Sequence, residues 1–340
     1  MPHDPMKVDL AEAYEAVFLA ALGRKPSADE VASWRANNGA VTPVGSLAKA
    51  LRTTEEFRNN VALQAERMAR SAEGRRVFFL HIPKSGGTSI RAQIRAGLGD
   101  VAPILLSENP LPHQVSSAAT TWPFLTGHVG IDSCPPEYSC VTVFREPRAR
   151  LLSLHRFIAS RHFEDWLSTI GLDSGVSRTW RESSIETILA GDGEGPLAAD
   201  RRFDGKSWLH FAWMYAERFS TPDAFASLGR DEREISIRRG LQRISHAAWS
   251  HDGPGIARMT ECATGRRPEV IHRLNVTKPT LSEAPGVIDR RTRDLLADFV
   301  RDDRQVLEMA ASAGLVAPLS AEDADAIFKE TAIRLGYIHE

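Results

Sequence analysis

A glycine-rich loop in the first third of the chain carries the residue types that bind an anion. It consists of Lys84, Ser85, Gly86, Gly87, Thr88 and Ser89. Glycines let the backbone approach a ligand, the hydroxyls add donors, and the lysine adds a positive point charge. The lysine precedes the glycines, whereas in the Walker A pattern GxxxxGK[ST] it follows them. The loop therefore predicts an anion site of another kind, with a structural turn as the alternative.

The residues on either side of this loop predict a strand before it and a helix after it. Residues 77–82 (VFFLHI) form a short apolar run with the length of a buried parallel strand. Ile90, Ile94 and Leu98 follow at helical spacing. This order brings backbone N–H groups and the positive end of a helix dipole to the top of a strand, where they bind an anion.

A second candidate site follows the next predicted strand. Residues 140–144 (CVTVF) end at Arg145, and a helix is expected to begin near Pro147, with Ser153 inside it. Ligands of open α/β sheets bind at the carboxyl ends of the strands. An arginine there can hold a phosphate with two hydrogen bonds, and the serine hydroxyl supplies another donor. A surface salt bridge is the alternative for Arg145, and Arg150 supports either the helix or the phosphate.

Both segments resemble motifs of the sulfotransferases that use 3′-phosphoadenosine 5′-phosphosulfate (PAPS). The string FFLHIPKSGGTSI resembles the 5′-phosphosulfate loop of the polysaccharide O-sulfotransferase branch, usually HIPKTGGTS, and Ser85 retains the hydroxyl of the usual threonine. FREPRARLLS resembles the segment that binds the 3′-phosphate, in which arginine and serine are eight positions apart, as Arg145 and Ser153 are.

A third string resembles the family's closing loop and C-terminal helix. It is HRLNVTKP, followed by LLADFVRDDRQVLEMA, which is predicted to be a helix. The resemblance implies that Lys278 can reach the cofactor, and an exposed loop lysine is the alternative. Like the two earlier motifs, this string implies a PAPS-binding chain that needs no metal, and the sequence contains neither HExxH nor CxxC.

The resemblance implies transfer of a sulfuryl group from PAPS to a hydroxyl of an acceptor, expected to be a glycan. Such a reaction needs a base for the hydroxyl and charge stabilisation on the leaving phosphate, and Lys84 suits the second role. LTGHVG resembles the segment with the catalytic histidine of the uronyl members, which implies His128 as the base, or else a structural turn histidine. His81 is predicted to be a strand-end residue, and His155 to pack on its helix or lie near the cofactor.

Residues 1–73 predict an all-helical module, separate from an α/β domain over residues 74–340. Ser27 and Glu30 have the spacing of a capping box for a helix that Gly39 ends, and similar signals predict three more helices. The strings AALGRKPSADEVASW and LRTTEEF resemble a small helical module of bacterial surface-associated and glycan-related proteins. The second domain is predicted to be α/β, with a P-loop-like central parallel sheet flanked by helices.

Composition and charge exclude several classes of protein. Hydrophobic residues make up 42% and charged residues 25% of the chain, which excludes disordered, collagen-like and disulfide-scaffold proteins. The 42 basic and 44 acidic side chains give a net charge of −2, so a nucleic-acid partner is not expected. No apolar run reaches the ~18 residues of a spanning helix, and no secretion signal is visible. Since no such run is present, we do not expect the chain to span a membrane. The chain contains Cys134, Cys140 and Cys262, which suit free thiols in a reducing compartment, so we expect it to be cytoplasmic.

Residues 161–260 are expected to hold the acceptor, because they are rich in tryptophan and arginine, although core packing is the alternative for the tryptophans. The string ISHAAWSHDGPGIARMTECA departs from the family's Val-Gly-x-Thr-Glu pattern, which leaves the acceptor open. Two other functions stay open as well. A nucleotide kinase or NTPase would bind ATP with magnesium, but the strand CVTVF ends in Arg145 where a Walker B strand has aspartate. A non-catalytic nucleotide-binding scaffold would bind the nucleotide without turnover.

Overall fold

The computed structural model describes residues 26–38, 51, 54–56, 59, 75–99, 101, 103–106, 122–161, 163–165, 175–189, 227–268 and 288–338. The chain divides into two compact units. One unit contains residues 1–70 and 169–172, and the other contains residues 71–168 and 173–340.

The first unit contains the helix that was predicted to start after Ser27. Helix α2 covers Ala28–Asn38. The Ser27 N–H donates to the Glu30 carboxylate at 2.7 Å, and the Glu30 N–H donates to Ser27 Oγ at 3.2 Å. This reciprocal pair confirms the predicted capping box. The other helices predicted for residues 1–73 lie wholly or largely outside the described residues.

The second unit is built on a five-stranded parallel sheet with the order β2-β3-β1-β4-β5. The strands are β1 (Val77–Leu80), β2 (Ile104–Leu106), β3 (Phe124–Gly127), β4 (Ser139–Phe144) and β5 (His246–Trp249). Every residue of β1 and β3 is buried, as in strands that are covered on both faces. The predicted α/β fold with a central parallel sheet flanked by helices is confirmed.

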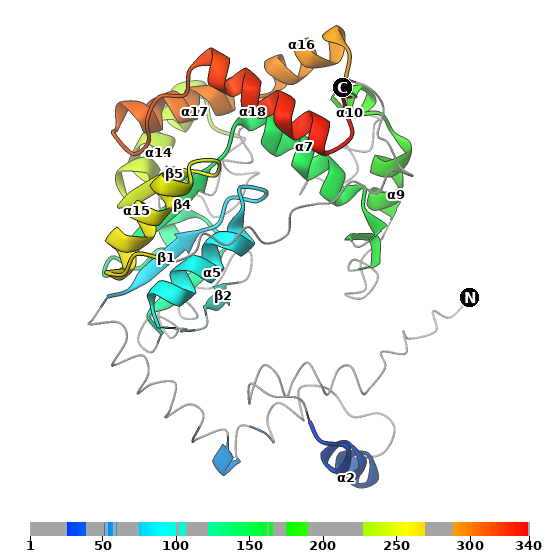
Figure 1. Ribbon diagram of the computed structural model, residues 1–340, viewed down its shortest axis with the longest axis vertical. Helices are drawn as coiled ribbons and strands as arrows, with labels where there is room; N and C mark the ends of the chain where they lie inside the picture. Colours follow the sequence, from blue (N-terminus) through cyan, green and yellow to red (C-terminus); the bar gives the residue numbers. More distant parts are fainter. Residues whose placement is uncertain are drawn as a thin grey trace. The chain divides into compact units, whose positions relative to one another are not determined.

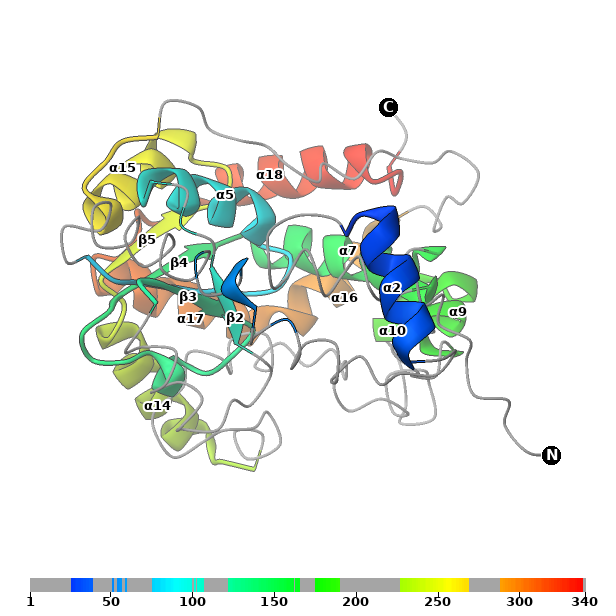
Figure 2. The same cartoon turned by 90° about the horizontal axis from the view of Figure 1, so that it is seen from below.

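Helices cover both faces of this sheet (Figure 2). Helices α5 (Gly87–Gly97) and α15 (Gly253–Thr264) lie on one face, and α14 (Arg230–Gln242) and α17 (Arg301–Ser312) lie on the other. The core on the second side contains side chains from β1, β4, α14 and α17, among them Phe78, Leu80, Phe144, Ile237, Leu241 and Val306. Within the described residues, no helix has both the length and the apolar character needed to cross a membrane.

A further group of helices packs beyond the carboxyl end of β4. Helix α7 (Pro147–Ile158) begins at the predicted proline and contacts α18 (Ala321–Arg334) and α9 (Gly175–Glu182) (Figure 1). Helix α10 (Ile185–Leu189) contacts α16 (Arg290–Phe299). Side chains of α7, α10, α16 and α18 share a second hydrophobic cluster. A short 3-10 helix, η1 (Ile131–Ser133), precedes β4.

The prediction of one helix over residues 295–310 was wrong, because the chain forms two helices there. Helix α16 ends at Phe299 and α17 begins at Arg301, with Val300 between them. Leu296 and Val300 are buried in the second hydrophobic cluster, whereas Val306 is buried in the core between the sheet and helices α14 and α17. The apolar faces of the two halves pack against different cores, so the chain turns at Val300.

Strands β1 and β4 are neighbours whose outgoing connections run to opposite sides of the sheet. After β1 the chain passes to β2 and β3 on one side, and after β4 it passes to β5 on the other. The carboxyl ends of β1 and β4 therefore lie at a topological switch point, where open α/β sheets bind their ligands. Residues 81–87 and 145–147 leave the sheet there.

Candidate functional site

The glycine loop turns sharply between β1 and α5. Gly86 has φ 87° and Lys84 has φ 64°, so two residues of the loop adopt left-handed backbone conformations. Gly86 is the N-cap of α5, and no side chain caps this helix end. The first amides of a helix have no partner within the helix, and their positive end attracts anions. The loop thus presents backbone donors at the carboxyl end of β1.

Ser85 adds a buried hydroxyl to this set of donors. The residue is 2% exposed, and its Oγ has no hydrogen-bond partner among the described residues. Buried polar groups in folded proteins nearly always have a partner, so this hydroxyl is available to a ligand that binds at the loop. Thr88 and Ser89 follow in the first turn of α5, and both are half-buried.

Arg145 joins the two segments that were singled out in the sequence. Its Nη1 donates to the Lys84 carbonyl oxygen at 3.0 Å, and its Nη2 donates to Thr331 Oγ1 at 3.4 Å. A guanidinium carries five N–H donors, so these two bonds leave capacity for an anion. The two motifs, 61 residues apart in the chain, are therefore in direct contact at the switch point.

The charges around the loop are mostly positive. Burial, followed by the nearby Arg145 charge, lowers the pKa of Lys84 to about 8. Burial, followed by Arg334 and Arg150, lowers the pKa of Arg145 to about 10, and Glu146 and Glu330 oppose this only in part. An anion that binds between buried cations relieves their mutual repulsion and so lowers the free energy of the site.

His128 lies beside His81 at the same end of the sheet. The two rings are 4.4 Å apart between centroids, and His128 Nε2 is 3.0 Å from His81 Nδ1. Leu80 pairs with Gly127 across β1 and β3, so the residues that follow them emerge side by side. His81 does follow a strand end, as predicted, but its contact with His128 was missed. Only the pairing register of the two strands could have revealed it.

Both imidazoles are neutral at pH 7. Burial, then Arg91 and Lys84, lowers the pKa of His128 to about 4. Burial and then His128 hold the pKa of His81 well below its usual value. A neutral imidazole is the form that accepts a proton.

These depressed pKa values predict a loss of stability in acid. The unfolded chain binds a proton at His128 near pH 6.5, whereas the folded chain binds it only near pH 4. Between these values the unfolded state carries more protons, so the free energy of unfolding falls as the pH is lowered from 6.5 towards 4. The contribution of His128 is about 3 kcal/mol.

Urea unfolding of wild type and His128→Gln between pH 4.5 and 7.5 measures this effect. The variant is expected to show a shallower dependence on pH than wild type. His246→Gln is the control, because His246 starts β5 at the opposite edge of the sheet. Equal slopes for wild type and His128→Gln would contradict the burial of a neutral imidazole.

Gly87 is required by the histidine next to it. A Cβ at this position would lie 1.7 Å from His81 Nε2, so any side chain displaces the imidazole. We expect Gly87→Ala to destabilise the protein by about 1–3 kcal/mol, the usual cost of overpacking. In a thermal-unfolding cycle, His81→Ala should relieve much of this cost, because it removes the clashing ring. Strictly additive effects of the two substitutions would contradict the contact.

Two further positions on α7 have structural roles. Arg150 is fully buried and its Nη2 pairs with Asp303 Oδ2 at 3.1 Å, which joins α7 to α17 and favours the helix-supporting role. Burial raises the pKa of Asp303, although Arg150 opposes the shift. His155 is also buried, with Nδ1 on the Tyr337 hydroxyl and the ring against Trp180. These contacts favour packing, which was one of the two alternatives predicted for His155.

The remaining candidates divide between the described and undescribed parts of the chain. Ser153 is half-buried on α7, two turns after Arg145. Lys278 lies outside the described residues. Cys134 and Cys140 are buried, Cys262 is exposed, and all three are free thiols. Within the described part of the chain, no group of three or more His, Cys, Asp or Glu side chains is arranged to hold a metal ion.

Comparisons of this chain with protein-family models, with curated proteins and with solved structures each gave no match.

Proposed function

We propose that this protein is a sulfotransferase that moves a sulfuryl group from PAPS to a hydroxyl of an acceptor, with a glycan as the expected acceptor class. The observation that carries the proposal is the 3.0 Å hydrogen bond from Arg145 Nη1 to the Lys84 carbonyl. It brings the loop that resembles the 5′-phosphosulfate motif and the segment that resembles the 3′-phosphate motif to one switch point. One doubly phosphorylated nucleotide can contact both only if they adjoin in this way.

The residues present suit such a ligand. The unpartnered Ser85 hydroxyl, the uncapped start of α5 and the Lys84 ammonium are all donors to an anion. Arg145 and Ser153 are the proposed contacts of the 3′-phosphate, and Lys278 is a further proposed contact. PAPS supplies an activated sulfuryl group on a phosphate leaving group. The P-loop-like character of the loop is part of this proposal.

Lys84 and His128 divide the chemistry in this proposal. The neutral imidazole of His128 takes the proton of the acceptor hydroxyl while the hydroxyl oxygen forms a bond to the sulfur of PAPS. The bond between sulfur and the bridging oxygen breaks, and the Lys84 ammonium stabilises the charge left on that oxygen. His81 contacts His128 at 3.0 Å and limits the orientations of the His128 ring.

We also propose a cytoplasmic location, because the described cysteines are free thiols.

A kinase or NTPase is less well supported by the same site. Strand β3 is followed by His128 and strand β4 by Arg145, so neither presents a carboxylate for magnesium. The next acidic residue, Glu146, is buried and accepts hydrogen bonds from the Ala149 N–H and from Arg148, each at 2.7 Å. Its carboxylate is therefore engaged in capping α7 rather than facing a nucleotide.

Calorimetry and a transfer assay test the proposal together. The wild-type protein is expected to bind 3′-phosphoadenosine 5′-phosphate, the desulfated product, without magnesium. It should also move radiolabelled sulfate from PAPS to at least one member of a panel of glycans and lipids. Failure to bind the product, or magnesium-dependent binding of ATP in its place, would overturn the proposal. Product binding without transfer to any acceptor would favour a non-catalytic scaffold.

A further inference from the structure

An aromatic side chain of α7 contacts the lysine of the glycine loop. Lys84 Nζ lies 4.2 Å from the centroid of the Phe157 ring. The face of an aromatic ring carries partial negative charge and attracts a cation at this distance. Phe157 is 36% exposed, so this contact forms at the surface of the second unit, where the ammonium group can also reach a ligand.

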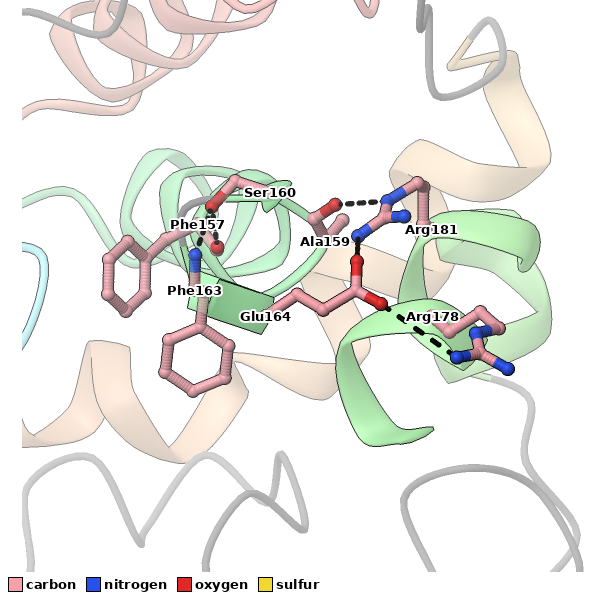
Figure 3. Close-up of polar contacts among 7 residues, drawn as sticks. All are labelled: Phe157, Ala159, Ser160, Phe163, Glu164, Arg178 and Arg181. Carbon is pink, nitrogen blue, oxygen red and sulfur yellow. Dashed lines mark hydrogen bonds and ion pairs between the residues drawn. The ribbon is translucent and has the colours of Figure 1, made fainter. Parts of the chain in front are cut away.

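The Phe157 ring is supported by the turn that follows α7 (Figure 3). The Ser160 hydroxyl donates to the Phe157 carbonyl at 2.6 Å and accepts from the Phe163 N–H at 3.2 Å. This arrangement brings the two phenylalanine rings to 4.9 Å between centroids at an angle of 54°. Phe163 is buried in a small cluster with Leu154, Ile158, Ala159 and Trp180. The exposed ring thus packs against a fixed one.

Helix α9 fastens this turn from the other side. Arg181 Nε donates to the Ala159 carbonyl at 2.9 Å, and Arg181 Nη2 pairs with the Glu164 carboxylate. Arg178 lies 3.9 Å from the other oxygen of Glu164 (Figure 3). An arginine on the last carbonyls of a helix stabilises its C-terminal end. The end of α7, where Phe157 lies, is therefore held in place by a second helix.

The charged groups around Lys84 are mostly positive, so they do not stabilise its ammonium group. Burial, followed by repulsion from Arg145 at the end of β4, lowers the pKa of the Lys84 ammonium to about 8. His81 and His128 also lie within electrostatic range of Lys84, and neither of them is an anion at neutral pH. In the part of the chain that the structure describes, Lys84 forms no ion pair with a carboxylate. The Phe157 ring is an electron-rich group that faces the ammonium.

We propose that Phe157 is a positioning residue for Lys84. The face of the Phe157 ring holds the Lys84 ammonium group beside the glycine loop, ready to stabilise the leaving phosphate. The inference rests on the proposed sulfuryl transfer for its catalytic consequence but not for the contact itself. A lysine side chain has many rotamers, and the ring selects those that keep the charge at the loop. Ordering before the reaction lowers the barrier to the step that needs the charge.

Substitution by leucine and by tyrosine separates the ring's electrostatic effect from its bulk. Leucine excludes water to a similar degree but has no aromatic face, so Phe157→Leu should lower the pKa of Lys84 by about 0.5. Phe157→Tyr keeps the face and should leave that pKa unchanged. Reductive methylation with ¹³C-formaldehyde makes the chain's lysines visible by NMR across a pH titration, and a Lys84→Arg sample identifies the signal.

Kinetics supply the second measurement. Phe157→Leu is expected to lower kcat by about fivefold with little change in the KM for PAPS, and Phe157→Tyr should match wild type. Ile235→Leu, an exposed apolar position on α14, is the matched control and should change neither quantity. A Lys84 pKa that stays constant or rises in Phe157→Leu would overturn the inference. If wild type transfers no sulfate but the NMR shift appears, the proposed function fails while the contact between Phe157 and Lys84 is upheld.

Discussion

Replacing Lys84 with alanine is expected to slow sulfuryl transfer by about a hundredfold to a thousandfold, the usual effect of removing a donor from a developing oxyanion. The ammonium is the positive group that the proposed mechanism assigns to the leaving oxygen. Burial makes its charge more effective than it would be in water, because the surrounding dielectric is lower. Product binding should weaken less than the rate, since Arg145 and the loop amides still hold the nucleotide.

The pH dependence of kcat/KM identifies the ammonium as the responsible group. The pKa of Lys84 in the ligand-free protein is lowered to about 8, so the charged form is lost as the pH rises through that value. For wild type, kcat/KM is therefore expected to fall above about pH 8, since this ratio reports on groups of the free enzyme. In Lys84→Arg the guanidinium stays charged, so the fall near pH 8 should disappear, although the absolute rate is lower because the geometry differs.

An exposed lysine on another helix serves as the control for these measurements. Lys329 lies on α18 and is exposed, so Lys329→Ala should retain the wild-type rate and pH profile. Sulfate transfer by Lys84→Ala within tenfold of wild type would remove Lys84 from the chemistry. A fall near pH 8 that persists in Lys84→Arg would assign that titration to another group.

The local parts of this fold could be predicted because their signals lie within a few residues. The buried run before the glycine loop, the proline that starts α7 and the box formed by Ser27 and Glu30 each depend on neighbours in the chain. Strand β1 nevertheless ends at Leu80 rather than at Ile82. The last two residues of the apolar run turn into the loop, and His81 contacts His128 there instead of extending the strand.

The contacts that complete the site could not be predicted, because they join distant parts of the chain. The Arg150–Asp303 pair spans 153 residues, and its formation depends on how α17 packs against α7. The contact of Phe157 with Lys84 likewise depends on the direction in which α7 leaves β4. The turn at Val300 has the same origin, since the sequence of residues 295–310 has no proline or glycine to mark it. Only the division of apolar side chains between two cores explains that turn.

Replacing Arg145 with alanine is expected to weaken binding of 3′-phosphoadenosine 5′-phosphate by at least about a hundredfold. A hydrogen bond to a charged group contributes about 1.5–3 kcal/mol, and the proposed contact of the guanidinium with the 3′-phosphate includes two such bonds. The variant also loses the bond to the Lys84 carbonyl, so the loop becomes less ordered. Arg145→Lys should recover only part of the affinity, because an ammonium cannot bind two oxygens in parallel.

Comparison of two nucleotides separates these two effects of Arg145. Adenosine 5′-phosphate lacks the 3′-phosphate, so its affinity should fall only slightly in Arg145→Ala, through the looser loop alone. The wild-type preference for the doubly phosphorylated nucleotide should then nearly vanish in the variant. Arg304→Ala, at an exposed position on α17, controls for the loss of one positive charge. Loss of a contact with the 3′-phosphate must weaken binding of the nucleotide that carries this phosphate more than binding of the one that lacks it. An equal loss of affinity for both nucleotides would therefore mean that Arg145 acts only on the loop.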